Sequence, residues 1–145
     1  MVSALQPKRD VSRLEDYLEA IYNLNEEKGF ISVADISEKL KVKPPTVSSM
    51  VAKLAKEGYV ERVKYRGMKL TPNGSKVARS VIRRHSTISE LLSMLGVGGE
   101  VAYEDTEGIE HHLHPVTIQK FERLVDFLRQ NPEFLERMKE GIEGA

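Results

Sequence analysis

The stretch that decides the fold is "KPPTVSSMVAKLAKEGYVERVKYRGMKLTP", which runs from Lys43 to Pro72. Its two adjacent prolines suit the first turn of a helix, and apolar residues at helical spacing follow them as far as Gly58. From there to Leu70 the sequence is rich in β-branched and aromatic residues, and a glycine-containing turn divides it. The stretch therefore predicts a helix followed by a small two-stranded hairpin.

Two more helices are predicted on the N-terminal side of this stretch. Ser12 and Glu15 form the capping-box pattern Ser-x-x-Glu, and the apolar residues after them predict a helix from Arg13 to Glu26. A similar pattern at Ser32 and Asp35 predicts a short second helix. Three helices followed by a hairpin form a winged helix-turn-helix, whose third helix fits the major groove of DNA.

The remainder of the chain is predicted to be helical. The expected helices start at Thr71-Pro72 and end at Leu95, run from Glu100 to Leu113 and from Pro115 to Gln130, and begin again at Asn131-Pro132. We therefore predict a mainly α fold with a small β-wing. Residues 1–72 would form an N-terminal winged helix-turn-helix domain, and residues 73–145 a second, all-helical domain.

The composition limits the possible classes of protein. The 145-residue chain is 40% apolar and 30% charged, which is typical of a globular protein. Its sequence contains no apolar run long enough for a membrane span and no signal peptide at its start, so we expect a cytoplasmic protein. The absence of cysteine excludes disulfides and thiolate metal sites, and any metal must bind to oxygen and imidazole ligands.

The net charge of zero is a cancellation between two halves. Residues 1–85 carry 17 Lys/Arg and 10 Asp/Glu, a net charge of +7, whereas residues 86–145 carry 5 and 12, a net charge of −7. A basic half favours a polyanionic partner such as DNA. The alternative is that its lysines only keep an exposed surface soluble.

The polar side of the predicted third helix supports DNA binding. Short hydroxyl side chains near its N-terminal end would meet base edges, and lysines beside them would lie at the height of the phosphates. Basic residues of the hairpin would lie beside or in the minor groove. These residues are Thr46, Ser48 and Ser49 for the bases, Lys43, Lys53 and Lys56 for the phosphates, and Lys64, Arg66 and Lys69 in the wing.

The acidic half contains "EGIEHH", residues 107–112. On a helix Glu107, Glu110 and His111 would share one face, at positions i, i+3 and i+4. Two carboxylates this close are tolerated on a solvated face, as an acid/base pair with a raised pKa, or around a cation. The sequence leaves these three interpretations open at this point.

Two further places contain residues of the same kind. Asp16 and Glu19 are three residues apart on the first predicted helix, and His85 falls on the apolar seam of the long helix. Each alone is more often an exposed helix face or a core histidine. Together with "EGIEHH" they could enclose one or two divalent ions, and the ligand types favour manganese or ferrous iron.

The second half also has more apolar side chains than a domain of its size should expose. We expect this surplus to form the interface of a homodimer. The residues are Ile88, Leu91, Leu92, Ile109, Leu113, Phe121 and Leu124.

An enzyme is the main alternative class, because carboxylates and histidines can form a two-metal hydrolase or a di-iron oxidase. Glu-x-x-His and His-Glu-x-x-His are both absent from the sequence, as is a glycine-rich phosphate loop. We therefore do not expect an enzyme. A DNA-binding module without a metal is a third interpretation.

Several of these stretches resemble one known family. "LEDYLEAIYNL", the stretch from Val33 to Ala78, "RRH" and "EDTEGIEHHL" are similar to the diphtheria toxin repressor family, in particular its manganese transport regulator branch. The resemblance covers residues 14–128, with the motifs in matching order. It implies a homodimeric, metal-activated repressor with a winged helix followed by a metal-binding and dimerisation domain.

The resemblance also assigns residues. The six metal ligands of the branch fall on Asp16, Glu19, His85, Glu107, Glu110 and His111. The DNA contacts of the family match Pro44, Thr46, Ser48, Ser49 and Arg66.

This sequence differs from the iron-responding relatives at positions that bind the metal. Those relatives place a cysteine at the position of Glu107 and a methionine at that of Asp16, so the residues found here favour manganese. Their second, ancillary metal site shares the histidine that matches His85. Its other ligands would fall on Ser89 and Tyr103, which are poor ligands, so we expect that site to be absent or rebuilt.

The functional hypothesis is a manganese-dependent repressor of metal-ion uptake genes, with Mn²⁺, or alternatively Fe²⁺, as the cofactor. Its partner would be double-stranded operator DNA. Because the six ligands belong to both predicted domains, one or two ions per subunit would bridge them and fix the dimer for DNA binding.

Overall fold

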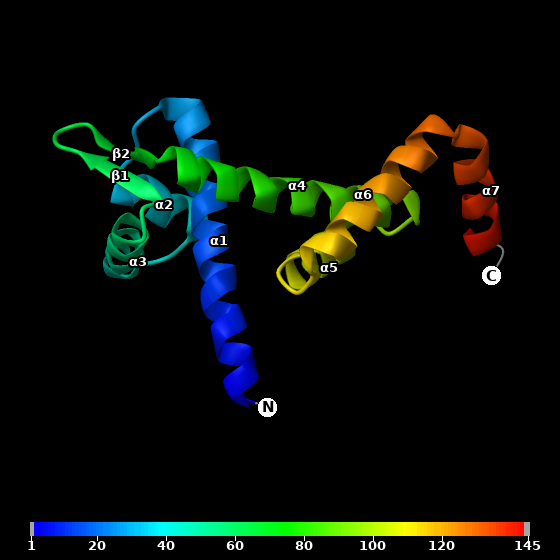
Figure 1. Ribbon diagram of the computed structural model, residues 1–145, viewed down its shortest axis with the longest axis horizontal. Coiled ribbons are helices and arrows are strands. Elements are labelled where there is room, and N and C mark those ends of the chain that lie inside the picture. The colour runs from blue at the N-terminus through cyan, green and yellow to red at the C-terminus, as the bar shows by residue number, and fades with distance from the viewer. Residues whose placement is uncertain (1, 144–145) are drawn as a thin grey trace. The chain divides into compact units, whose positions relative to one another are not determined.

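The computed structural model describes the backbone of residues 2–143 and the side chains of residues 13–143. Figure 1 shows helices with one small hairpin, which confirms the predicted mainly α fold with a β-wing. In chain order the elements are α1 (Val2–Lys28), α2 (Val33–Leu40), α3 (Pro44–Lys56), β1 (Val60–Val63), β2 (Gly67–Leu70), α4 (Pro72–Met94), α5 (Gly99–Glu110), α6 (Pro115–Gln130) and α7 (Pro132–Glu143).

The chain divides into two compact units, and the division falls within α4, between Ile82 and Arg83. The first unit contains α1, α2, α3 and the hairpin, and the second contains α5, α6 and α7. Both units contain part of α4. The predicted domain boundary, between residues 72 and 73, corresponds to the start of this helix.

The start of α2 shows the capping box expected from the sequence. The Ser32 hydroxyl accepts a hydrogen bond from the Asp35 backbone N–H at 3.2 Å, and the Asp35 carboxylate accepts one from the Ser32 backbone N–H at 2.9 Å. Two of the donors that a helix start leaves without partners are thereby satisfied.

The predicted third helix is confirmed as α3, with Pro44 and Pro45 in its first turn. Its end has the hydrogen bonds of a Schellman motif: Tyr59 N–H donates to the Leu54 carbonyl and Gly58 N–H to that of Ala55. Gly58 has φ +85°, a left-handed conformation that glycine adopts without a steric penalty. The chain is thus turned from α3 into the hairpin.

The hairpin is antiparallel, with Val60 paired to Leu70 and Val63 to Gly67. An isolated bridge between Ile31 and Met68 connects it to the segment before α2. A Cβ atom at Gly67 would lie 2.4 Å from the Ile31 carbonyl oxygen, so this close approach of two backbones requires glycine. The wing is therefore held at its base by the rest of the first unit.

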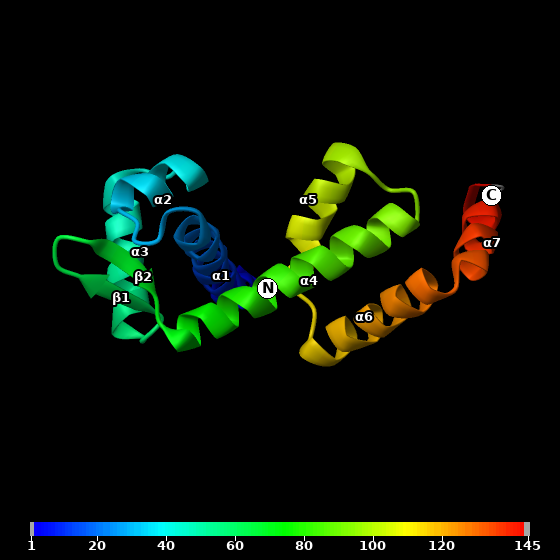
Figure 2. The ribbon, with the colours of Figure 1, turned by 90° about the horizontal axis from the view of Figure 1, so that it is seen from above.

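The first unit has one apolar core. The side chains that form it come from α1, the segment before α2, α2, α3, both strands and the start of α4, and α1 packs against α2 and β2. Fully buried members include Leu18, Ile21, Ile36, Val47, Val51 and Leu54. This packing fixes the orientation of α3, and the turned view in Figure 2 shows α1, α2, α3 and the hairpin grouped together.

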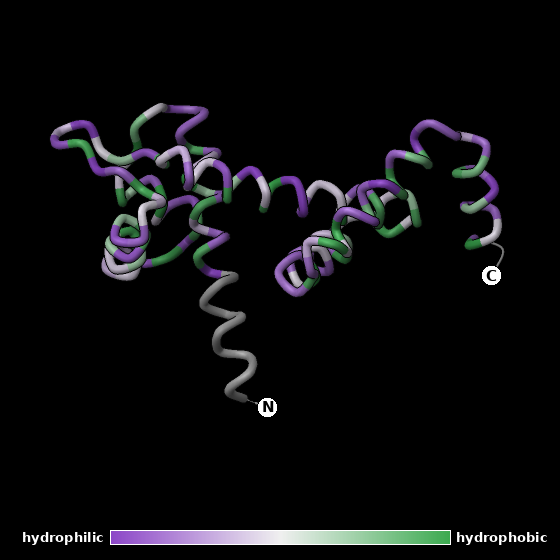
Figure 3. Tube along the Cα trace, viewed as in Figure 1, coloured by the Kyte–Doolittle hydropathy of each residue, from purple (hydrophilic) through white to green (hydrophobic). Residues whose placement is uncertain are grey.

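The second unit has a smaller core. Met94 on α4 packs with Val125 and Leu128 on α6, and Leu135 and Met138 on α7 cover them. In Figure 3 hydrophobic and hydrophilic residues alternate along α6 and α7, as expected for helices that bury one face. No residue of α7 is fully buried.

Two predicted helix boundaries were wrong. The first helix begins at Val2 rather than Arg13, because its backbone continues through the Ser12 capping-box pattern, which marks a start only where the preceding residue leaves the helix. The fifth ends at Glu110 rather than Leu113. His111 and His112 form a turn, and His114, which precedes Pro115, is extended with ψ 151°, so the chain leaves the helix over the residues before the proline.

Among the residues that the structure describes, no helix combines the length and apolar character that crossing a bilayer requires.

Candidate metal centre and DNA-binding surface

The second unit brings two histidines and two carboxylates together. His85 Nδ1 on α4 lies 2.8 Å from Glu110 Oε2 and 3.3 Å from Glu107 Oε1 on α5. The other Glu110 oxygen, Oε1, lies 3.1 Å from His111 Nε2. One ligand atom each from Glu107, Glu110 and His111 lies within 4.8 Å of the others. We call His85, Glu107, Glu110 and His111 the carboxylate–imidazole cluster.

Glu110 is the centre of this cluster. It is 0% exposed, and both of its oxygens face imidazole nitrogens. Burying a carboxylate is costly unless it is paired and hydrogen-bonded or coordinates a metal. Carboxylate oxygens and imidazole nitrogens that converge in a partly buried position are ligands that suit a first-row divalent ion, so the donor set fits the metal that the sequence predicts.

The local structure explains how "EGIEHH" presents its ligands. Glu107 and Glu110 lie one turn apart on α5, and His111 is the C-cap with φ −85° and ψ −5°. This conformation is close to helical, so His111 stays beside the two carboxylates although α5 has already ended. His112 and His114, in contrast, are exposed.

Asp16 and Glu19, the other two predicted ligands, belong to the first unit. They lie one turn apart on α1, and both are partly buried. Their participation in a metal site depends on how the two units are arranged, and it stays a prediction.

The recognition helix predicted for DNA is amphipathic. Its apolar side, with Val47, Val51 and Leu54, is buried in the core of the first unit. The predicted contacts on the helix and just before it are all exposed, namely Lys43, Pro44, Thr46, Ser48, Ser49 and Lys53. A helix that buries one side and exposes short hydroxyls flanked by lysines is suited to the major groove.

The wing presents basic residues at its tip. Lys64 and Arg66 are exposed, and between them Tyr65 is 94% exposed with φ +68°. The Lys64 ammonium lies 5.2 Å from the centre of the Tyr65 ring, a cation–π distance. Exposed cations at the end of a hairpin are suited to DNA phosphates.

Asn25 on α1 holds the base of the wing, a role that was not predicted from the sequence. Its side-chain amide donates to the carbonyls of Gly29 (2.7 Å) and Met68 (3.3 Å) and accepts from the Leu70 N–H (3.1 Å). The asparagine is part of a helical pattern, and nothing in that pattern marks a contact 45 residues away.

The predicted dimer residues differ in exposure. Ile109 and Leu124 are exposed, and Leu91, Leu92, Leu113 and Phe121 are partly buried. Ile88 is only 2% exposed in the single chain. All seven stay predicted interface residues.

Comparison with protein families covers nearly the whole chain. Residues 11–68 match the family described as "Iron dependent repressor, N-terminal DNA binding domain", and residues 71–139 match "Iron dependent repressor, metal binding and dimerisation domain". The chain belongs to the iron-dependent repressor family. The charge division at residue 85 therefore falls inside the segment that matches the metal-binding and dimerisation domain, and the basic half contains the whole segment that matches the DNA-binding domain.

Curated relatives within this family carry the name "HTH-type transcriptional regulator MntR". The protein from Lysinibacillus sphaericus is 42% identical over 126 residues, which cover 87% of this chain and 91% of that protein. The one from Bacillus pumilus is 45% identical over 120 residues, which cover 83% of each chain.

Solved structures show the same fold. The manganese regulator SloR is 34% identical, with a TM-score of 0.71 over 79% of this chain, and T. acidophilum IdeR is 35% identical, with a TM-score of 0.67 over 76%. The chain spans about half the length of these two solved chains, 54% and 53%.

Proposed function

We propose that the protein is a manganese-dependent transcriptional repressor of metal-ion uptake genes, which acts in the cytoplasm as a homodimer on double-stranded operator DNA. The observation that carries the proposal is the carboxylate–imidazole cluster around the buried Glu110, in a chain whose other unit exposes a polar recognition helix. The relatives named MntR and the manganese regulator SloR support manganese as the metal.

The proposed metal ligands come from both units. His85, Glu107, Glu110 and His111 would hold one or two ions, and we propose that Asp16 and Glu19 complete the set. The bound ion would supply positive charge that cancels the repulsion between carboxylates. Hard oxygen donors combined with imidazole suit Mn²⁺.

The proposed DNA contacts are the exposed residues of α3 and the wing. Thr46, Ser48 and Ser49 can exchange hydrogen bonds with base edges, and the exposed Pro44 would make an apolar contact next to them. Lys43, Lys53, Lys64 and Arg66 would contact phosphates and provide a salt-dependent affinity.

Metal binding and DNA binding would be coupled, because the proposed metal ligands are divided between the two units. α1 carries Asp16 and Glu19, and through Asn25 the same helix holds the wing. If metal binding fixes α1 against the second unit, it also fixes the DNA-binding surface. Linkage then requires that DNA tighten metal binding by the same factor as metal tightens DNA binding.

The second candidate is an iron-dependent repressor with the same DNA-binding surface. The name of the family favours it. Glu107 and Asp16 stand against it, because the iron-responding relatives replace these oxygen ligands with cysteine and methionine. Manganese and ferrous iron have similar ligand preferences, so only a direct comparison separates the two candidates.

The test is fluorescence anisotropy of a labelled duplex selected from a random pool with the full-length protein and manganese. The protein is titrated at fixed salt in a chelator, in manganese and in anaerobic ferrous iron. The proposal predicts tight binding with manganese only. Equal activation by iron supports the second candidate, and tight binding in the chelator contradicts metal dependence.

A further inference from the structure

Strand β2 has a partner on each of its two edges. On one edge it pairs with β1, and on the other the backbone of Ile31 exchanges two hydrogen bonds with that of Met68, at 3.0 and 2.8 Å. The Asn25 side chain comes next along this second edge, where its amide donates to the Met68 carbonyl at 3.3 Å and accepts from the Leu70 N–H at 3.1 Å. The last turns of α1 therefore lie beside the base of the wing (Figure 1).

The Asn25 amide takes the place of a peptide group at this edge. A carboxamide has a carbonyl oxygen and two N–H donors, so it can accept from one strand N–H and donate to one strand carbonyl, as a neighbouring strand would. The same amide also donates to the Gly29 carbonyl at 2.7 Å, just after the end of α1. Aspartate would lack the donors, and leucine would lack both kinds of group.

The hydrogen bonds of Asn25 are made where water has little access. Met68 is 4% exposed and Leu70 is 8% exposed. A buried N–H that loses its acceptor keeps the full cost of its desolvation, so losing the Asn25 amide should loosen this edge of β2. Asn25 therefore fixes the position of β2 against α1.

The hairpin converts a small movement at its base into a larger one at its tip. Arg66 lies four residues before Leu70, about 13 Å along an extended strand, so a rotation of about 10° at the base would move the tip by about 2 Å. A hydrogen bond to a phosphate oxygen that is stretched by about 2 Å is lost. The exposed cations of the tip, Lys64 and Arg66, therefore depend on how the base is held.

We propose that Asn25 is a positioning residue for DNA recognition, which holds the wing at the angle from which Lys64 and Arg66 reach the DNA backbone while α3 occupies the major groove. The inference rests on the proposed function, because it assigns a role within DNA binding. Asn25 acts through the wing rather than by touching the DNA. Its substitution should therefore weaken only the part of the DNA affinity that the wing contributes.

The substitution that tests this role is Asn25→Leu in the full-length protein. Leucine has a similar size and a higher helix propensity, so α1 is preserved while the polar groups are removed. Asn23→Leu is the matched control, since Asn23 is also partly buried on α1 but, two residues earlier, lies on a different side of the helix. Asn25→Asp, which keeps an acceptor and loses the donors, is the second variant. Urea unfolding shows that each variant is folded in the assay.

The first measurement is amide hydrogen exchange of the free protein, followed by NMR. In Asn25→Leu the protection of the Leu70 amide should fall by about tenfold, because its acceptor is gone. The amide resonances of the wing, residues 63–69, should shift in the same variant. Asn23→Leu should match the wild type in both respects. Unchanged protection of Leu70 in Asn25→Leu would overturn the proposal without any use of DNA.

The second measurement is DNA affinity by anisotropy, with manganese and the selected duplex, arranged as a double-mutant cycle. Asn25→Leu should weaken binding severalfold and reduce the slope of log affinity against log salt by about 1–2, since each phosphate contact contributes about 0.9. In a protein that already carries Lys64→Ala and Arg66→Ala, it should have almost no further effect. Combined with Lys53→Ala on α3, it should have its full effect.

The cycle separates this role from a general loss of stability. An equal loss in all three backgrounds would mean that Asn25 supports the fold as a whole, and it would overturn the proposal while leaving the proposed function intact. A wild type that bound no duplex in manganese or in ferrous iron would contradict the proposed function, and the positioning role with it.

Discussion

His85 Nδ1 and Glu110 Oε2 lie 2.8 Å apart, although the two residues are 25 positions apart in the sequence. The contact connects α4 to the last residue of α5 and places a fully buried carboxylate beside an imidazole. Any change that removes the charge of Glu110 should therefore affect the whole cluster.

Glu110→Gln keeps the size of the side chain and removes its charge. We expect manganese affinity to fall by at least about tenfold, because even the partners of ligands typically matter by 10- to 100-fold. Isothermal titration of the metal-free protein measures the loss. Glu104→Gln, an exposed substitution on the same helix, is the control. Wild-type affinity in Glu110→Gln would remove Glu110 from the ligand set.

Asp16→Asn tests whether the first unit contributes ligands. If Asp16 completes the site, manganese affinity falls by about tenfold or more, and metal-activated DNA binding weakens with it. Binding in the chelator should stay as weak as that of the wild type. Glu26→Gln, exposed on the same helix, is the matched control. A variant that binds metal normally but has lost DNA activation would place Asp16 outside the site.

Much of this architecture could be predicted from local signals. Pro44 and Pro45, the glycine after α3 and the period of Val47, Val51 and Leu54 each determine structure within a few residues. "EGIEHH" likewise predicts its own clustering, because a helix places residues i, i+3 and i+4 together. The start of α1 and the end of α5 were less predictable. Each depends on neighbouring residues that lie outside the sequence pattern from which the helix was predicted.

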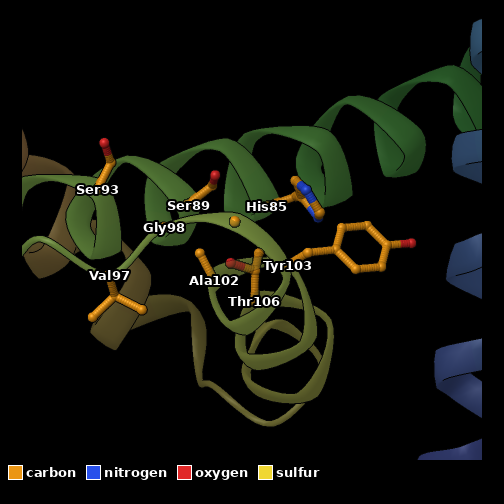
Figure 4. A pocket seen from close by; sticks show the side chains of 9 residues that line it. His85, Ser89, Ser93, Val97, Gly98, Ala102, Tyr103 and Thr106 are labelled. Carbon is orange, nitrogen blue, oxygen red and sulfur yellow. The ribbon is translucent and has the colours of Figure 1, made fainter.

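The properties missed by the sequence analysis depend on contacts between distant elements. Asn25 holds the wing through Met68 and Leu70, and no spacing rule connects a helical asparagine with a strand. The burial of Thr106, which is 1% exposed and lies on the side of α5 that faces α4 (Figure 4), is likewise not indicated by its place in the sequence. The full burial of Glu110 also became evident only in three dimensions.

The recognition helix should show two kinds of DNA contact. Ser48→Ala should relax specificity at one base pair, at a cost of about 1–3 kcal/mol against the preferred base. Lys53→Ala should weaken binding to all sequences alike and reduce the slope of log affinity against log salt by about 1. Anisotropy with a panel of duplexes at several salt concentrations separates the two effects. Lys120→Ala, exposed in the second unit, is the control for lost charge. Uniform losses with Ser48→Ala would contradict a base contact.

The capping box of α2 should make the stability of the first unit depend on pH. The Ser32 backbone N–H, followed by the hydrogen bond from Lys28 at 3.1 Å, lowers the pKa of Asp35 below its ordinary value of 3.8. A lowered pKa contributes stability that is fully present above the unfolded value and is lost as pH falls through the folded one. Ser32→Ala, which removes the hydroxyl cap, should cost about 1 kcal/mol at neutral pH.

Asp35→Asn isolates the charge. Because only the wild type has a carboxylate to protonate, the wild-type advantage in free energy of unfolding should be constant near neutral pH and shrink as the pH falls below 3.8. Urea unfolding at a series of pH values measures this difference. Glu61→Gln, an exposed substitution on β1, should show no such convergence. If the difference between wild type and Asp35→Asn grew at low pH, the carboxylate of Asp35 would be stabilised in its neutral form, and its assignment as a charged helix cap would be wrong.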